Sequence, residues 1–194
     1  MKFPFLPAAF LLLFVGIVFG GCSSSPSSPV SITPVAYTNL SQLALSQAEL
    51  PFTIHGEQTK TPNMKDPTLS QYGAIRGYTR YVINEKTESA TSIQLGQTIV
   101  EYPPGNASLA FAAFVNQSRN ADQSQYKLTW LLDPGIGETS CAFIVTDKSG
   151  NQEPIAMIVF VKSNIMESVI LIAPSTDIDT LTRAAKVAAE KIPS

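Results

Sequence analysis

Two arginines and a tyrosine occupy every second position of the stretch Arg76-Gly77-Tyr78-Thr79-Arg80. Alternate residues of a β-strand point to the same side of the sheet, so Arg76, Tyr78 and Arg80 would share one face. Guanidinium groups bind carboxylates, phosphates and sugar acids through paired donors, and the tyrosine ring offers a stacking surface. We therefore take these three residues as the candidate binding site for an anionic small molecule. The alternative is an exposed strand face on which Tyr78 packs against the arginine stems.

The groups that usually carry catalysis are sparse. His55 is the only histidine, which excludes a zinc site built on histidines, and a Ser-His-Asp triad would have to use it. The acids most relevant to a hydrolase are scattered and mostly near expected turns, where we interpret them as solvated groups: Asp133, Glu138, Asp147, Glu153 and Glu167. We expect no enzyme, no cofactor and no metal site.

Charge and cysteine content narrow the possible partners. Charged residues make up 14% of the chain, the net charge is −2, and the lysines and arginines are dispersed, which argues against nucleic-acid binding. The two cysteines are Cys22 and Cys141. Cys141 lies in an apolar stretch and is expected to be a small buried hydrophobic residue, without a disulfide partner if Cys22 is modified.

The elements that must position these groups follow from apolar periodicity. Alternation over residues 72–83 and 93–99 predicts a hairpin, and further strands are expected at 52–57, 126–132, 141–146, 155–161 and 169–173. The strands at 155–161 and 169–173 are apolar on both faces, which indicates central strands of a covered sheet. The segment 39–51 predicts a short helix or strand that enters the domain, and 58–69 predicts a loop.

Two stretches show helical periodicity. A stripe that includes Phe111 and Phe114 predicts a helix over about 106–119, with Asn106 as its N-cap. A second stripe predicts a helix over about 176–192, capped by Thr176 and Asp179. The fold class is therefore α+β, a mainly antiparallel sheet of about five to seven strands packed by these two helices.

The chain opens with an apolar run over residues 3–19. The run ends in the tetrad Phe19-Gly20-Gly21-Cys22, and a Ser/Pro-rich tract follows Cys22. This tetrad resembles the lipobox of prokaryotic membrane lipoproteins, although Phe19 replaces the usual aliphatic residue. The resemblance implies a signal peptide over 1–21, a lipid on Cys22, and an extracytoplasmic protein attached to the cell membrane. The alternative is an uncleaved membrane anchor. Residues 22–38 are then a linker, and 39–194 form one globular domain.

The order of the expected elements, from hairpin to C-terminal helix, also resembles small exported lipoproteins with a PsbP-like sandwich. This resemblance is topological, covers about residues 72–192 and implies no site residue. It implies a binding, assembly or accessory role. We therefore expect a binding or accessory module of the cell envelope, with an anionic small molecule or an envelope protein as its partner. The alternatives are an envelope hydrolase and a structural protein-interaction module.

Overall fold

Seven strands form one sheet in which every pair of neighbours is antiparallel. The computed structural model describes residues 39–84, 93–173 and 177–193. The predicted signal peptide, Cys22 and the linker therefore lie outside the described residues. The spatial order is β1-β2-β3-β7-β6-β5-β4. The strands are β1 (Gly56–Lys60), β2 (Arg76–Asn84), β3 (Ile93–Glu101), β4 (Tyr126–Trp130), β5 (Thr139–Asp147), β6 (Ile155–Lys162) and β7 (Ile165–Ile172).

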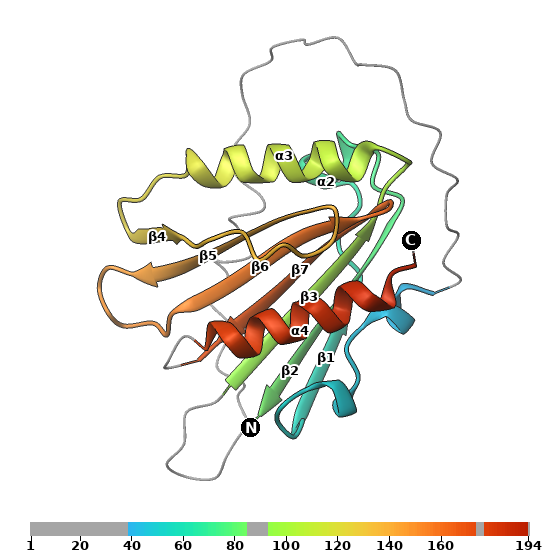
Figure 1. The fold of residues 1–194 in the computed structure, drawn as a ribbon. Coiled ribbons are helices and arrows are strands. Elements are labelled where there is room, and N and C mark those ends of the chain that lie inside the picture. Colours follow the sequence, from blue (N-terminus) through green and yellow to red (C-terminus); the bar gives the residue numbers. More distant parts are fainter. Residues whose placement is uncertain (1–38, 85–92, 174–176, 194) are drawn as a thin grey trace.

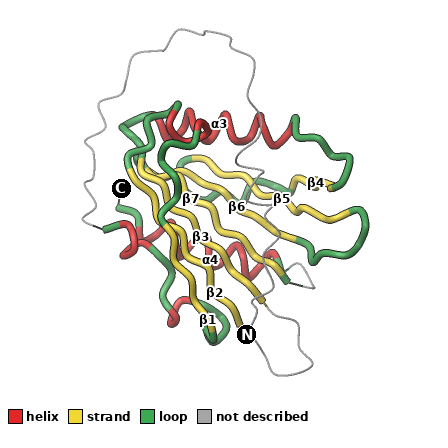
Figure 2. The backbone as a smooth tube through the Cα atoms, turned by 180° about the vertical axis from the view of Figure 1, so that it is seen from behind, coloured by secondary structure: helices red, strands yellow, loops and turns green. Residues whose placement is uncertain are grey.

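Two helices of equal length pack on opposite faces of the sheet. They are α3 (Asn106–Arg119) and α4 (Ile178–Lys191), and both contact the central strands β6 and β7. In Figure 1 α4 crosses in front of the strands, whereas in Figure 2, from behind, the strands lie in front of it. A short helix, α2 (Pro67–Ser70), lies beside the start of α3. The predicted α+β class, antiparallel sheet and two packing helices are confirmed.

The sheet separates two hydrophobic clusters. The cluster on the α4 side contains residues of α4, of the segment before β1 and of the strand positions that face them. The other cluster contains residues of α3 and of the strand positions on the opposite face of the sheet. Strand β6 is buried along seven of its eight residues, which confirms that both of its faces are covered. Within the described residues, no helix combines the length and apolar character that a membrane-spanning helix needs.

The start of the domain differs from the prediction. The first strand covers 56–60 and not 52–57, and the expected loop at 58–69 contains the rest of β1 and most of α2. Strand β1 is an edge strand with polar, mostly exposed residues, so it lacks the apolar alternation on which strand prediction relies. The segment 39–51 forms two 3₁₀ turns, η1 (Leu40–Leu43) and η2 (Gln47–Glu49).

The helix caps also differ from the prediction. Gly105, at a φ of 82°, occupies the N-cap of α3, while the side chain of Asn106 donates to the backbone oxygen of Tyr72. At α4 the N-cap is Asp177, whose carboxylate accepts from the amide of Thr180. Thr176, the predicted cap, lies outside the described residues. Both helices still begin within two residues of their predicted starts.

Candidate functional site

Strand β2 places Arg76, Tyr78 and Arg80 on one side of the sheet, the side on which α4 packs. Tyr78 is half-buried and packs against the α4-side cluster. The even-numbered positions of β2 share this face because side chains alternate along the strand, and the next one, Val82, is part of the core. The structure thus brings the three predicted site residues together on one face.

Each of the two arginines is paired with a carboxylate of the protein. Arg80 forms two parallel hydrogen bonds with Glu57 of β1, Nε to Oε1 at 3.0 Å and Nη2 to Oε2 at 2.9 Å. The Nε of Arg76 lies 2.5 Å from Oε2 of Glu101 on β3. An anionic ligand at this face would have to compete with a protein carboxylate at each guanidinium group.

The register of the sheet extends this face into a track of polar side chains across β2, β3 and β7. Arg76 is opposite Glu101, and Arg80 is opposite Gln97. Between these two rows, Tyr78, Ile99 and Glu167 follow one another across the three strands. We define the polar track as the side chains of Arg76, Arg80, Gln97, Glu101 and Glu167.

Glu167 lies in the middle of the track and is completely buried. Its Oε1 accepts a hydrogen bond of 2.5 Å from Nε2 of Gln97, and its Oε2 has no hydrogen-bond partner among the described residues. Burial raises the pKa of Glu167 to about 8, although the hydrogen bond from Gln97 and the charge of Lys191 act in the opposite direction. The interpretation of Glu167 as a solvated turn residue is therefore wrong.

Glu167 was misassigned because its strand begins earlier than predicted. Strand β7 starts at Ile165 and not at Val169, so Glu167 lies inside an otherwise apolar strand. Its neighbours two positions away, Ile165 and Val169, are both fully buried. Gln97 shows the same signal, since it lies between the core residues Leu95 and Ile99 on their face of β3. In both β3 and β7, a polar residue occupies a position whose neighbours two residues away are apolar and buried. This pattern is the sequence signal by which Gln97 and Glu167 could have been identified as a buried polar pair.

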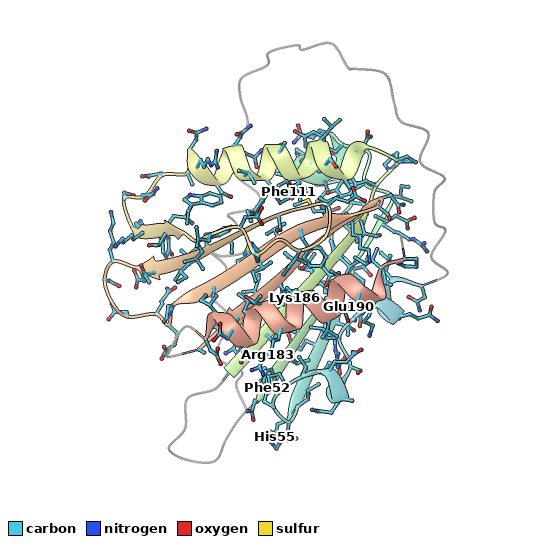
Figure 3. All side chains as sticks on the ribbon, viewed as in Figure 1. Phe52, His55, Phe111, Arg183, Lys186 and Glu190 are labelled. Atoms are coloured by element: carbon cyan, nitrogen blue, oxygen red, sulfur yellow. The ribbon has the colours of Figure 1, made fainter. Side chains whose placement is uncertain are left out.

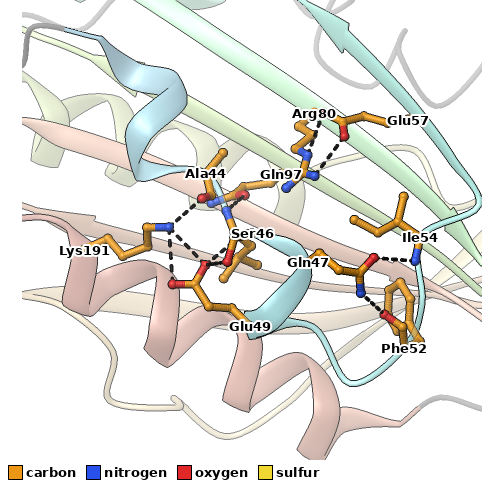
Figure 4. Close-up of polar contacts among 11 residues, drawn as sticks. Ala44, Ser46, Gln47, Glu49, Phe52, Ile54, Glu57, Arg80, Gln97 and Lys191 are labelled. Carbon is orange, nitrogen blue, oxygen red and sulfur yellow. Dashed lines mark hydrogen bonds and ion pairs between the residues drawn. The ribbon is translucent and has the colours of Figure 1, made fainter.

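A segment that precedes β1 contacts the polar track at Gln97, and we call residues 39–50 the strap. Its apolar side chains are buried in the α4-side cluster: Leu40, Leu43, Ala44, Leu45 and Leu50. The backbone amide of Leu45 donates to Oε1 of Gln97 at 2.8 Å, a fully internal contact. Gln97 therefore joins the strap to Glu167 through the two ends of its side-chain amide. Figure 4 shows Gln97 beside the strap.

Lys191, in the last turn of α4, holds the strap from the other side (Figure 4). Its Nζ donates to the backbone oxygen of Ala44 at 2.6 Å and lies 3.0 Å from Oε2 of Glu49. The carboxylate of Glu49 also accepts from the amide and the hydroxyl of Ser46. Partial burial raises the pKa of Glu49, but the hydrogen bonds from Ser46 and Lys191 outweigh it and leave this pKa below its usual range.

A second buried acceptor lies at the Arg76 end of the track. Asn164, in the turn between β6 and β7, donates from Nδ2 to Oε1 of Glu101 and to the backbone oxygen of Tyr102, both at 3.3 Å. Its Oδ1 is buried without a hydrogen-bond partner among the described residues. Glu101 is thus held between Asn164 and Arg76, and this end of the track is a structural network.

The described residues outside the polar track show no arrangement typical of a catalytic or metal-binding site. His55 is exposed just before β1, and Arg183, Lys186 and Glu190 lie on the exposed side of α4 (Figure 3). Burial raises the pKa of the Cys141 thiol to about 12, so this buried cysteine is a poor nucleophile. In the part of the chain that the structure describes, no group of three or more histidine, cysteine or acidic residues could hold a metal ion.

A small cavity lies on the other face of the sheet, between α2 and α3. Its volume of about 20 Å³ has room for about one water molecule. Side chains from both helices and from the sheet line it: Thr68, Leu69, Tyr72, Tyr102, Ala110, Ala113, Phe114, Gln117 and Met166. It is too small to accept an organic ligand without rearrangement.

Comparison with known proteins identifies a similar fold. No protein-family model and no curated protein matches the chain. Among solved structures, the chain is similar to the extracellular domain of PknH from Mycobacterium tuberculosis, with 14% sequence identity and a TM-score of 0.59. The match covers 82% of this chain and 97% of that domain. At this identity the similarity shows a shared fold, that of a domain which in PknH lies outside the cell.

Proposed function

We propose that this protein is a binding or accessory module of a prokaryotic cell envelope, attached to the membrane through its N-terminus and facing away from the cytoplasm. The observation that carries the proposal is the fold, which is shared with an extracellular domain and follows an N-terminal sequence typical of exported, anchored proteins. In this proposal Cys22 carries the lipid and residues 22–38 connect it to the strap.

The described residues support a role in binding more than one in catalysis. His55 is exposed and Cys141 is buried with a raised thiol pKa. The most unusual acid, Glu167, is completely buried, so a substrate could not reach it in this conformation. A hydrolase would need an accessible nucleophile or a carboxylate pair that faces a cleft.

The ion pairs of Arg76 and Arg80 make one kind of partner more favourable than the other. Because the guanidinium groups of Arg76 and Arg80 bind Glu101 and Glu57, capture of a small anion would require breaking these pairs. We therefore favour an envelope protein as the partner, and the small anionic ligand becomes the second candidate. In both cases the domain acts at the outer side of the membrane.

Surface labelling of intact cells tests this proposal. Lys60, Lys148 and Lys186 are exposed and come from β1, the β5–β6 turn and α4. An amine reagent that reaches the cytoplasmic membrane but does not cross it should therefore modify them in cells in which that membrane is intact. A cytoplasmic protein of the same cells serves as the control and should stay unmodified until lysis. Modification of the three lysines only after the cytoplasmic membrane is opened would contradict an extracytoplasmic location.

A further inference from the structure

The side chain of Gln97 is the only part of the described hydrogen-bond network that connects the strap directly to Glu167. One end of its amide accepts from the backbone of Leu45, and the other end donates to Oε1 of Glu167. Both side chains are essentially inaccessible to solvent. A change in the charge of Glu167 would therefore act on the strap through one shared partner.

We propose that Glu167, Gln97 and Lys191 form a proton-sensitive latch that controls how firmly the strap is held against the sheet. With a proton on Glu167 the buried carboxyl group is neutral, and Lys191 is free to hold the Ala44 oxygen and the Glu49 carboxylate. The structure contains both of these contacts of Lys191. The latch is independent of the proposed function and would operate in any location of the protein.

Loss of the proton to the solvent leaves a negative charge in the core. Gln97 already donates a hydrogen bond to Oε1 of Glu167. Oε2 of Glu167 has no hydrogen-bond partner among the described residues that could stabilise the charge. A buried charge without a partner is strongly unfavourable, so the surroundings must rearrange. Either Lys191 turns toward Glu167 and releases Ala44 and Glu49, or the strap lifts and admits water. Both rearrangements loosen the strap.

Among the charged groups near Glu167, Lys191 is the one that we expect to respond to a negative charge on Glu167. On β2, Arg80 is bound by Glu57 of β1, and Arg76 is bound by Glu101 of β3. The strap contributes Glu49, α4 contributes Lys191, and β2 also contributes the phenol of Tyr78. Lys162 of the neighbouring strand β6 is on the same face, and its Nζ donates to the backbone oxygen of Ala189 in α4. The charge of Lys191 acts on Glu167 even though its hydrogen bonds go to the strap. Lys191 can therefore exchange a partner on the strap for one in the core.

Loosening should be local. The strap is also held by its buried leucines, because their apolar surface is removed from water against the α4-side cluster. Complete detachment of the strap would expose all of them. We expect the opening to be confined to residues 44–49, where Lys191 and Gln97 make their contacts.

Thiol labelling of the full-length protein in detergent micelles tests the latch. Ala44→Cys places a thiol in the strap, and its labelling rate is compared with that of the double variant Ala44→Cys with Glu167→Gln over a pH series. We divide the rate of Ala44→Cys by the rate of the double variant, because this ratio cancels the pH dependence of the thiol itself. The Glu167→Gln side chain can still accept from Gln97 through its amide oxygen but has no proton to lose in this pH range. The native Cys141, buried on the opposite face, reports any opening of the whole domain.

The latch predicts that this ratio is near one at about pH 6 and rises about tenfold by about pH 9, while Cys141 stays unlabelled. A ratio that stays near one at every pH would overturn the proposal, and so would labelling of Cys141 in parallel with the strap. If Ala44→Cys does not fold, deuterium uptake by the peptide over residues 39–50 replaces the labelling. The wild type should then exchange faster than Glu167→Gln at high pH and equally fast at low pH, and equal exchange throughout would overturn the proposal.

Discussion

The amide nitrogen Nε2 of Gln97 lies 2.5 Å from Oε1 of Glu167, and this contact joins two polar side chains inside an otherwise apolar layer. Gln97 is 1% exposed and Glu167 is 0% exposed. Hydrophobic residues of similar size at these two positions would avoid the cost of burying a carboxyl group. The pair therefore points to a role beyond packing, and a buried titratable group of this kind should make the stability of the domain depend on pH.

Replacement of Glu167 by glutamine should remove a pH dependence of stability. Burial raises the pKa of Glu167 from an ordinary 4.5 to about 8 in the folded state, so the folded protein binds more protons between these values. The stabilising effect of the raised pKa is complete below about pH 4.5 and is lost as the pH rises toward 8, at about 1.4 kcal/mol per pH unit. Glu167→Gln should therefore be more stable than the wild type at pH 8, with a smaller difference at pH 5. Urea unfolding of both proteins at the two pH values measures this, and a difference independent of pH would refute the burial of a neutral acid.

The two arginines of the polar track should differ in their contribution to stability. The side chain of Glu101, the partner of Arg76, is 8% exposed, whereas that of Glu57, the partner of Arg80, is 42% exposed. Arg76→Ala strands a buried carboxylate and should cost about 3 kcal/mol or more. Arg80→Ala leaves an exposed carboxylate and should cost about 1 kcal/mol or less in lost ion pairing.

Chemical denaturation of the two single variants tests this difference. Glu101→Gln combined with Arg76→Ala should recover much of the lost stability, because the stranded group is then neutral. No recovery of stability in the double variant would show that Arg76 does not serve to neutralise Glu101.

Two glycines of the β4–β5 loop provide a matched pair of variants. Gly135 and Gly137 both have positive φ, 64° and 68°, so alanine is strained at each position. A Cβ at Gly135 would meet nothing within 4 Å, whereas one at Gly137 would lie 2.3 Å from the backbone oxygen of Val161. Gly135→Ala should cost about 1–2 kcal/mol, and Gly137→Ala should cost clearly more because a strand backbone must move. Equal melting temperatures for the two variants would contradict this packing of the loop against β6.

Much of the fold could be predicted because its signals are local. Helix α3 has a clear apolar stripe and was predicted with its observed bounds, 106–119. The hairpin of β2 and β3 and the burial of β6 follow in the same way from alternation and from a continuous apolar run. The predicted position of β1 is displaced from the observed one because the polar, exposed residues of this strand show no apolar alternation.

The candidate site could be predicted only in part because its contacts are remote in sequence. Arg76, Tyr78 and Arg80 were found on one face of one strand, as strand geometry requires. Their partners come from other strands, and the pairing of β3 with β7, which joins Gln97 to Glu167, connects segments 70 residues apart. The strap could not be predicted as a cover, since its two short 3₁₀ turns follow no helical or strand period.

Membrane attachment through Cys22 is tested most directly by fractionation of cells that express either the wild type or Cys22→Ser, with mass spectrometry of the N-terminus of each. The proposed function predicts that the wild type is found in the membrane fraction as a chain that begins at an acylated Cys22. The Cys22→Ser protein should lack the acyl group. A wild-type chain that retains residues 1–21, together with a Cys22→Ser variant that stays in the membrane to the same extent, would show an uncleaved anchor and contradict the lipid attachment. A wild type found only in the soluble cytoplasmic fraction would contradict the envelope function itself.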